Sequence, residues 1–381
     1  MSVDCSKFVV KYNLFYTMIY TIEKVTTLIG ARRFGSTDAK IGFILTDSRS
    51  LCFPEETLFF ALKSGRNDGH RYILELYHRG VRNFVVTEVP ANYASDYPQA
   101  NFLKVVDSLE SLQRLAERHR DEFNIPIVGI TGSNGKTMVK EWLNQLLSDD
   151  LFVTRSPRSY NSQVGVPLSV WLLNEHSQVG VFEAGISQPG EMLALRDIIQ
   201  PTIAVLTNLG DAHQENFVSR EAKCKEKLVL FHDAKIVVYN GDDSLISDCV
   251  NALEDFRGER LYWSCSDHNA PFFVKSIEKK ATATTITYIY KGIESWYSLP
   301  FIDDASITNS FACAAVALTL GVSKDALDER MLQLEPIAMR LEVKQGQHGC
   351  TLINDSYNSD INSLDIALDF MNRRPDHQGR R

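Results

Sequence analysis

The stretch from Pro126 to Thr137, which reads PIVGITGSNGKT, constrains the fold of this chain more than any other feature. Ile127 to Ile130 form a short apolar run typical of a buried parallel strand, and the glycines after it end that strand abruptly. From Met138 onward apolar residues recur at steps of three and four, which predicts a helix with one apolar face. Where such a strand meets such a helix, backbone N–H groups and the positive end of the helix dipole converge. The stretch therefore predicts a phosphate-binding loop.

The loop departs from the common pattern G-x-x-x-x-G-K-[ST], because Ile130 stands where that pattern has its first glycine. Its residues are Gly132, Ser133, Asn134, Gly135, Lys136 and Thr137. The small residues let the backbone approach a phosphate, Lys136 can reach terminal phosphate oxygens, and the Thr137 hydroxyl can bind magnesium. The alternative is a glycine-rich turn with a solvated lysine. It is disfavoured because strand, loop, Lys-Thr pair and helix occur together and in order.

Composition bounds the class of protein. A chain of 381 residues with 44% hydrophobic content is expected to form two or three packed domains. The net charge of -8 argues against nonspecific nucleic-acid binding, so any anionic substrate needs a local basic site. No apolar run approaches the roughly 20 residues that cross a membrane, so we expect no membrane insertion. Seven cysteines without a C-x-x-C pair indicate reduced thiols in a cytoplasmic protein and offer no zinc site.

The pattern along the chain predicts an α/β protein with three domains. Residues 1–17 carry Asp4 and Lys11 in or near an apolar run, which makes a poor secretory signal, and we expect them to lie outside the fold. Residues 18–106 indicate a small N-terminal α/β domain and residues 107–333 a central domain. Residues 334–381 indicate the start of a C-terminal domain that does not reach full length.

Two polar clusters in the N-terminal domain are candidate substrate contacts. They are Asp47-Ser48-Arg49 and Asp68-Gly69-His70. Taken alone, each is better explained by ordinary loop and helix-cap chemistry. Together they could line a pocket for a phosphorylated or nucleotide-bearing substrate, with Arg49 on the diphosphate.

In the central domain, apolar runs recur at the spacing of βα units, which predicts a mainly parallel sheet with helices on both faces. The runs are residues 127–130, 151–153, 179–182, 203–206 and 236–239. Polar residues stand where three of them end, namely Glu183, Asn208 and Asn240. Chemistry gathers at the carboxyl ends of parallel strands, so Glu183 could hold magnesium near the phosphate loop.

Three further features belong to this domain. His213, just past another strand end, is a candidate neighbour of metal or phosphate, although a lone histidine is more often a surface or core residue. Lys223 and Lys225 indicate a solvated basic face. Between residues 272 and 300 apolar and polar residues alternate, which predicts antiparallel strands, and a helix from about Asn309 to Leu320 follows.

Several motifs of this chain resemble those of the Mur ligase family. They are GITGSNGKT from Gly129, SYNSQVGVPLS from Ser159, FEAGISQPGEM from Phe182, LTNLGDAH from Leu206, AKCKEKL from Ala222, YNGDD from Tyr239 and INDSYNSDINSL from Ile353. The likeness covers nearly everything after Met18. The DSYN segment matches the member that adds a dipeptide and distinguishes it from the other Mur ligases.

The resemblance implies a domain for a UDP-sugar, a central ATPase-like domain and a Rossmann-like C-terminal domain that closes over the nucleotide. It implies an ATP-dependent amide ligation that joins D-alanyl-D-alanine to UDP-N-acetylmuramoyl-tripeptide in peptidoglycan precursor synthesis. The precursor carboxylate would attack the γ-phosphate to give an acyl phosphate, and the dipeptide amine would displace phosphate. Such a site has to align the reactants and neutralise charge.

The resemblance also assigns roles to residues. Lys136 and the loop amides would grip the β- and γ-phosphates of ATP, while Thr137, Glu183 and His213 would hold Mg²⁺. Lys225 aligns with the lysine that several Mur ligases carry as a carbamate, an anion suited to a magnesium site, and Lys223 is the runner-up. Asn161, Ser48 and Arg49 would lie near the substrate, Asn208, Asn240 and Asn309 near metal or nucleotide, and Arg340 and Asp355 near the phosphates and the ribose.

Two alternatives stay open. One is another Mur-type or folylpolyglutamate-type ligase, against which the DSYN segment argues. The other is a non-catalytic nucleotide-binding fragment, because residues 334–381 are far shorter than the C-terminal domain of the family. On that ground we expect weak or absent ligase turnover from this chain alone. Some relatives continue into an alanine racemase, so a fused or separate racemase is an expected partner.

Overall fold

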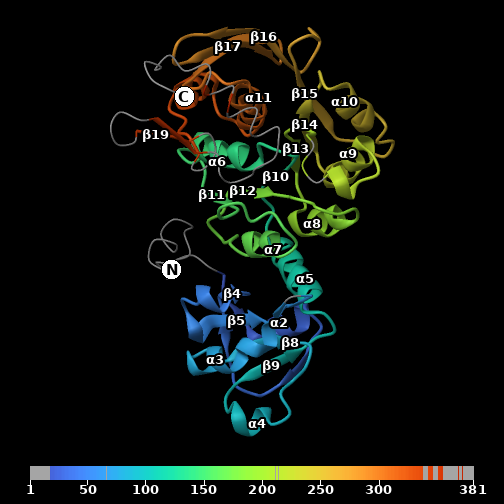
Figure 1. The fold of residues 1–381 in the computed structure, drawn as a ribbon, viewed down its shortest axis with the longest axis vertical. Coiled ribbons are helices and arrows are strands. Elements are labelled where there is room, and N and C mark those ends of the chain that lie inside the picture. The colour runs from blue at the N-terminus through green and yellow to red at the C-terminus, as the bar shows by residue number, and fades with distance from the viewer. Residues whose placement is uncertain are drawn as a thin grey trace. The chain divides into compact units, whose positions relative to one another are not determined.

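The computed structural model describes residues 18–65, 67–210, 212, 214–337, 342–345, 351–354, 368 and 371. The predicted extension of residues 1–17 lies outside them. The chain divides into two compact units (Figure 1). The first comprises Met1–Pro126, Thr154–Phe182 and Leu193–Gln200, and the second Ile127–Val153, Glu183–Met192 and Pro201–Arg381.

The first unit is built on a five-stranded sheet in the order β2-β9-β8-β5-β4. Strands β4, β5, β8 and β9 run parallel, and β2 pairs antiparallel with β9 at one edge. The strands are β2 (Arg32–Phe34), β4 (Phe43–Leu45), β5 (Thr57–Phe60), β8 (Asn83–Val86) and β9 (Asn101–Lys104). Two short antiparallel pairs accompany it, β1 (Tyr20–Thr21) with β3 (Lys40–Ile41) and β6 (Lys63–Ser64) with β7 (Asn67–Asp68).

Alternation along β5 divides the core of this unit in two. Leu58 and Phe60 pack in one cluster with α2 (Ile22–Leu28) and α5 (Ser108–Arg120). Phe59 packs in the other with α3 (Ile73–His78). Successive side chains of a strand point to opposite faces, so helices cover both faces of this sheet. The remaining short helices are η2 (Ser48–Ser50), η3 (Pro54–Glu56), η4 (Gly69–Tyr72), α4 (Tyr93–Asp96) and α7 (Gly165–Val170).

A buried histidine joins three segments of the first unit. His119 Nε2 donates to the Leu173 carbonyl at 3.0 Å, so its Nδ1 accepts from the Tyr20 hydroxyl at 2.8 Å. Its ring lies 4.6 Å from that of Trp171. Burial lowers the pKa of His119 from 6.5 to about 3, which keeps the ring neutral.

The second unit holds the run β10-β13-β14-β15-β16-β17-β18 of a larger sheet. Strands β10 to β16 pair parallel, and β16, β17 and β18 pair antiparallel. The predicted α/β fold with a mainly parallel central sheet and an antiparallel extension is confirmed. The strands are β10 (Ile127–Thr131), β13 (Ile203–Leu206), β14 (Ile236–Asn240), β15 (Glu259–Ser264), β16 (Phe272–Lys279), β17 (Thr284–Tyr290) and β18 (Ile293–Leu299). The same sheet includes β11 (Val153–Arg155) and β12 (Val179–Glu183).

Helices connect the strands of this unit and follow the last of them. They are α6 (Lys136–Leu147), α8 (Glu191–Ile199), which continues into the first unit, η5 (Gln214–Asn216), α9 (Arg220–Leu228), η6 (Val229–Phe231), α10 (Ser244–Asn251), α11 (Asp304–Thr319) and α12 (Lys324–Leu332). Figure 1 shows α11 beside α6, with which it packs. The helix predicted from about Asn309 begins earlier, at Asp304, because the Asp303 carboxylate caps it by accepting from Ser306 N.

Beyond Ile337 the structure describes an antiparallel hairpin of β19 (Glu342–Gln345) and β20 (Thr351–Asn354). The rest of the predicted C-terminal domain lies outside the described residues, and the boundaries 18–106, 107–333 and 334–381 stay a prediction. Within the described part of the chain, no helix is both long and apolar enough to cross a membrane.

Candidate functional site

The phosphate loop joins β10 to α6 through two glycines that no other residue could replace without strain. Gly132 has φ of 142°, and a Cβ there would come within 1.9 Å of Thr207 Oγ1. Gly135 has φ of 83°, and a Cβ there would come within 2.5 Å of Asn309 Oδ1. Both angles lie in the region that favours glycine. Backbone therefore lines the loop at the N-terminus of α6, as an anion site requires.

The loop is held by the residues that follow β13. The Asn208 carbonyl accepts from Ser133 N at 3.0 Å, and its Oδ1 accepts from Asn134 N at 2.9 Å. The Thr207 hydroxyl donates to the Asn134 carbonyl at 2.5 Å. Asn208, predicted near the metal or nucleotide, thus touches the loop and fixes its shape.

Lys136 rests on its own loop. Its Nζ donates to the Gly132 carbonyl at 2.8 Å and to the Ser133 carbonyl at 3.1 Å. The side chain of a second lysine, Lys227, donates to the same Gly132 carbonyl at 3.2 Å. Two lysine side chains therefore meet at the loop, where a polyphosphate would bring negative charge.

The structure brings together Thr137 and Glu183, two of the predicted magnesium ligands. The Thr137 hydroxyl donates to Glu183 Oε2 at 3.1 Å, and Glu183 has no exposed surface. Ala184 N donates to the Ile130 carbonyl at 2.8 Å, which keeps Glu183 beside the end of β10. A hydroxyl and a carboxylate are the hard oxygen donors that Mg²⁺ prefers, so the residues present fit this ion. His213, the third predicted ligand, lies outside the described residues.

Helix α9 places its lysines on opposite faces. Lys223 and Lys227, four residues apart, are both buried, whereas 61% of the Lys225 side chain is exposed. Lys223 Nζ donates to the Gly210 carbonyl at 2.5 Å and to the Ala212 carbonyl at 3.2 Å. Lys225 pairs with Glu221 at 2.6 Å. The predicted solvated face therefore describes Lys225 and not Lys223.

The sequence did not predict a role for Lys227, although its spacing from Lys223 indicates that the two lysines share a helical face. Burial, reinforced by the neighbouring charges of Lys136 and Lys223, lowers the pKa of Lys227 from 10.5 to about 7. On the exposed face of α9, in contrast, the hydrogen bond to Glu221 raises the pKa of Lys225. Lys227 is thus the α9 lysine that combines contact with the loop and a neutral amine near pH 7.

Asn309 and Asn240, both predicted to lie near metal or nucleotide, are found on α11 and at the end of β14. Asn309, buried on α11, places its Nδ2 3.3 Å from Met138 Sδ and packs against Gly135. Asn240 ends β14, and its Oδ1 accepts from Asp242 N at 3.0 Å. Arg340 and Asp355, the predicted contacts of phosphate and ribose, lie outside the described residues.

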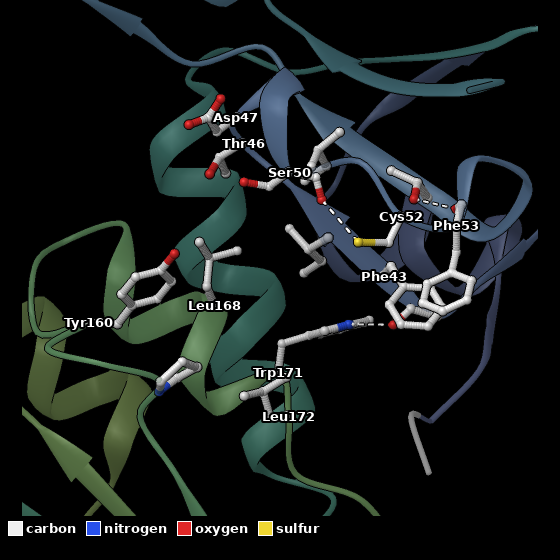
Figure 2. Close-up of a pocket in the computed structure, with 15 residues that line it drawn as sticks. Phe43, Thr46, Asp47, Ser50, Cys52, Phe53, Tyr160, Leu168, Trp171 and Leu172 are labelled. Atoms are coloured by element: carbon white, nitrogen blue, oxygen red, sulfur yellow. Dashed lines mark hydrogen bonds between the residues drawn. The ribbon is translucent and has the colours of Figure 1, made fainter. Parts of the chain in front are cut away.

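A separate cavity of about 170 Å³ opens in the first unit. Figure 2 shows Tyr160, Leu168 and Trp171 on one side of it and Phe43 and Phe53 on another. The rings of Phe43 and Phe53 stack with centroids 4.4 Å apart. Trp171 Nε1 donates to the Gly42 carbonyl at 2.9 Å, which fixes the indole at the wall. Pockets that enclose a drug-sized ligand start at roughly 300 Å³, so this cavity fits one ring-sized group.

The Asp47-Ser48-Arg49 cluster lies at this cavity, whose lining includes Asp47 and Ser50. The Arg49 side chain is 86% exposed and its guanidinium pairs with Asp47 at 2.6 Å, which lowers the pKa of that carboxyl. Ser48 is buried, and its carbonyl accepts from Arg79. Asn161 is half-buried and follows the cavity residue Tyr160.

The Asp68-Gly69-His70 cluster has a structural role in this geometry. His70 Nδ1 lies 2.7 Å from Asp68 Oδ1, and its Nε2 accepts from Thr87 N at 3.1 Å. A Cβ at Gly69 would meet the Ala61 backbone at 2.8 Å. These contacts fasten the segment to the end of the sheet, which is the loop and cap chemistry favoured from the sequence.

Fold and loop together define an α/β protein with a phosphate loop between a strand of a mainly parallel sheet and the helix that follows it. The sequence profile of the Mur ligase middle domain matches residues 130–317. The UDP-N-acetylmuramoyl-tripeptide–D-alanyl-D-alanine ligase of Bacillus subtilis is 28% identical over 332 residues, which cover 85% of this chain and 69% of that protein. The chain is therefore similar to the Mur ligases, in residues 130–317 to their middle domain and over 85% of its length to the Bacillus subtilis ligase.

Solved structures agree on the fold. The crystal structure of MurF from Acinetobacter baumannii matches with a TM-score of 0.83 and 24% identity, over 94% of this chain and 77% of that one. The MurF ligase from Thermotoga maritima, solved in complex with ADP, matches with a TM-score of 0.74 and 25% identity, over 91% and 76%.

Proposed function

We propose that this chain joins D-alanyl-D-alanine to UDP-N-acetylmuramoyl-tripeptide at the expense of ATP, in peptidoglycan precursor synthesis. The observation that carries the proposal is the phosphate loop, with Thr137 and Glu183 meeting at its end. Relatives whose alignments cover 85% and 94% of this chain, at 28% and 27% identity, carry that activity in their names.

In this proposal the loop amides and Lys136 hold the β- and γ-phosphates. Lys136 exchanges the Gly132 and Ser133 carbonyls for phosphate oxygens when the nucleotide arrives. Asn208 keeps the loop in its shape through two contacts, and Asn309 packs beneath the start of α6. The substrate carboxylate and the γ-phosphate are thereby aligned, which is the main catalytic contribution in phosphoryl transfer.

Mg²⁺ would be held by Thr137 and Glu183, with His213 as a further proposed ligand. When bound, the ion neutralises charge on the phosphate oxygens. The protein's own contribution is to keep the Glu183 carboxylate buried at the loop, where it would hold the ion. Arg340 and Asp355 are proposed to approach the phosphates and the ribose.

We assign the carbamate proposed for this family to Lys227 in place of Lys225. Carbamoylation requires a neutral amine, which attacks carbon dioxide and releases one proton. A pKa of about 7 supplies that amine at neutral pH. The resulting anion would lie among Lys136 and Lys223, whose charges now disfavour the protonated form of Lys227. Lys225, exposed and paired with Glu221, has neither property.

The UDP-sugar is proposed to bind the first unit. The aromatic cavity accepts one planar ring, and Asp47 and Ser50 offer polar partners at its wall. Arg49, at the exposed edge of the same cluster, could exchange Asp47 for a diphosphate oxygen. Ser48 and Asn161 are proposed to act at the same substrate.

Two expectations follow from the proposed activity. Its substrates are a nucleotide-linked precursor and a dipeptide, which are available in the cytoplasm, so we propose that location. D-Alanine for the dipeptide has to come from a racemisation, so an alanine racemase, fused or separate, stays a proposed partner.

An ADP-release assay tests this function. With UDP-N-acetylmuramoyl-tripeptide present, ADP release is expected to depend on D-alanyl-D-alanine. Release that depends on another amino acid would point to a different ligase of the family. Nucleotide binding without any release would indicate a binding fragment.

Lys136→Ala is the matched variant for this assay. It removes the ammonium that grips the terminal phosphates, so ADP affinity is expected to fall at least about tenfold, or 1.4 kcal/mol, in isothermal titration calorimetry. Lys225→Ala is the control, because Lys225 lies exposed on the outer face of α9. Unchanged ADP affinity in Lys136→Ala would contradict the proposed nucleotide site.

A further inference from the structure

Lys140 lies behind the Thr137–Glu183 pair and has no part in the function proposed above. It follows Thr137 by one turn of α6, and its side chain is fully buried. Its Nζ lies 3.1 Å from Glu183 Oε1 and 3.1 Å from Glu141 Oε1. The ammonium therefore sits between two carboxylates, one of them the proposed metal ligand.

The two oxygens of Glu183 face different partners. Oε2 accepts from the Thr137 hydroxyl, the other proposed magnesium ligand, at 3.1 Å. Oε1 faces the Lys140 ammonium. Because both side chains of this ion pair are fully buried, little water competes for either group, and the pairing orients the carboxylate. Oε2 is thus the oxygen that contacts the other proposed ligand, and Oε1 is the oxygen that lies against Lys140.

Divalent ions differ in what they take from a carboxylate. Mg²⁺ requires near-octahedral geometry and is usually held by single oxygens from one or two carboxylates. Ca²⁺ takes six to eight oxygens and accepts both oxygens of one carboxylate. A glutamate with one oxygen held by an ammonium therefore suits Mg²⁺ better than Ca²⁺.

We propose that Lys140 is a positioning residue that restricts Glu183 to single-oxygen coordination and so favours Mg²⁺ over Ca²⁺ at the loop. This rests on the proposed function, which supplies the metal–nucleotide complex. Lys140 acts through Glu183. If it only balanced charge, its loss would change the affinities for both ions by the same factor.

The test compares the two ions in Lys140→Met, which removes the ammonium and keeps most of the length of the side chain. Mg²⁺ and Ca²⁺ are titrated calorimetrically into protein saturated with the non-hydrolysable analogue AMP-PNP, with protein-free titrations subtracted. The Ca²⁺ affinity is expected to rise relative to the Mg²⁺ affinity by about tenfold, a change of 1.4 kcal/mol. A ratio within twofold of the unmodified protein overturns the proposal.

Two further variants separate positioning from charge. Glu141→Gln alters the other neighbour of Lys140 and leaves the Lys140–Glu183 pair in place, so its ion preference is expected to match the unmodified protein. Lys140→Arg keeps a cationic donor and is expected to restore the preference. A shift in Glu141→Gln equal to that in Lys140→Met would overturn the proposal.

Crystal structures of the unmodified protein supply an answer even if Lys140→Met does not fold. With Mg²⁺ and AMP-PNP bound, Glu183 is expected to coordinate through Oε2 alone, with Lys140 still on Oε1. Coordination through both oxygens would overturn the proposal. If the unmodified protein binds neither metal–nucleotide complex, the proposed function fails instead, so the two failures are distinguishable.

Discussion

Gly135 and Gly292 share a left-handed backbone and differ in their surroundings. Their φ angles are 83° and 75°. A Cβ at Gly135 would meet Asn309 Oδ1 at 2.5 Å, whereas nothing lies within 4 Å of a Cβ at Gly292. Substituting each glycine by alanine therefore separates two losses of stability, one from the left-handed backbone angle and one from crowding at the loop.

Gly292→Ala is expected to lower the free energy of unfolding by about 1 kcal/mol, the cost of a left-handed residue with a side chain. Gly135→Ala is expected to cost about 2 to 3 kcal/mol, because crowding against a packed neighbour adds to that strain. It should also weaken ADP binding, which Gly292→Ala should not. Urea unfolding and calorimetry measure both effects. Equal losses in the two variants would contradict the tight packing of Asn309 on the loop.

His119 gives the first unit a pH dependence of stability. Its pKa is about 3 in the folded protein and 6.5 when exposed, so between these values the unfolded state binds more protons. Stability therefore falls as the pH is lowered through this window. From pH 6.5 to 5 the expected loss is about 2 kcal/mol, at 1.36 kcal/mol for each pH unit.

His119→Gln is expected to be less stable at pH 7 and to flatten this dependence, because the amide does not titrate. Urea unfolding at pH 5, 6 and 7 measures the slope. The exposed His78 provides the control, since His78→Gln should keep the slope of the unmodified protein. A slope unchanged in His119→Gln would exclude His119 as its source.

At the scale of elements, α9 shows how one helix gives its lysines different surroundings. Lys223 and Lys227 are buried on one face and Lys225 is exposed on the other, because residues four apart share a face and residues two apart do not. Lys227→Ala is expected to lower the ligation rate at least about a hundredfold, the scale of a lost group that acts on transition-state charge. Lys225→Ala is expected to stay within about twofold, as for an exposed ion pair.

Initial rates of ADP release measure this contrast. In Lys227→Ala, part of the rate should return with added acetate or formate, small carboxylates that could replace a carbamate. Loss of activity in Lys225→Ala with Lys227→Ala unaffected would reverse the assignment.

Most elements could be predicted from local pattern. β13 occupies the predicted residues 203–206, because a buried strand shows as an uninterrupted apolar run. β11 begins at Val153 and not at the predicted Leu151, because Leu151 N still bonds to the Leu147 carbonyl at the end of α6. Apolar character alone does not separate the last turn of a helix from the strand that follows.

The site could be predicted in part. The order of residues indicated the loop, and strand ends indicated Glu183 and Asn208, because parallel strands deliver their carboxyl ends to one edge. The partners of these groups could not be predicted, since they depend on tertiary contacts. Lys140, one turn into α6, and Lys227, in a run that reads as solvated, acquire their roles only through burial.

At the scale of the whole molecule, the two proposed ligands fall in different units. The phosphate loop belongs to the second unit and the aromatic cavity to the first. Hydrogen exchange with ADP and Mg²⁺ is expected to protect residues 127–147 and 207–210, and with UDP residues 42–57 and 157–172. Groups that open locally exchange fastest, and bound ligand suppresses that opening. Protection of the phosphate loop by UDP would contradict the assignment of the cavity.

The contact of Lys136 with its own loop bears on which anions the protein selects. Two carbonyls already satisfy the ammonium, so an incoming ligand has to displace them. A small anion can replace only a few of the displaced hydrogen bonds. The linked phosphates of a nucleotide can accept hydrogen bonds from several loop donors at once, and the entropy of association is lost only once for the whole ligand. The contact of Lys136 with its own loop thus favours ligands that carry two or more linked phosphates. AMP and inorganic phosphate should compete poorly where ADP and ATP succeed.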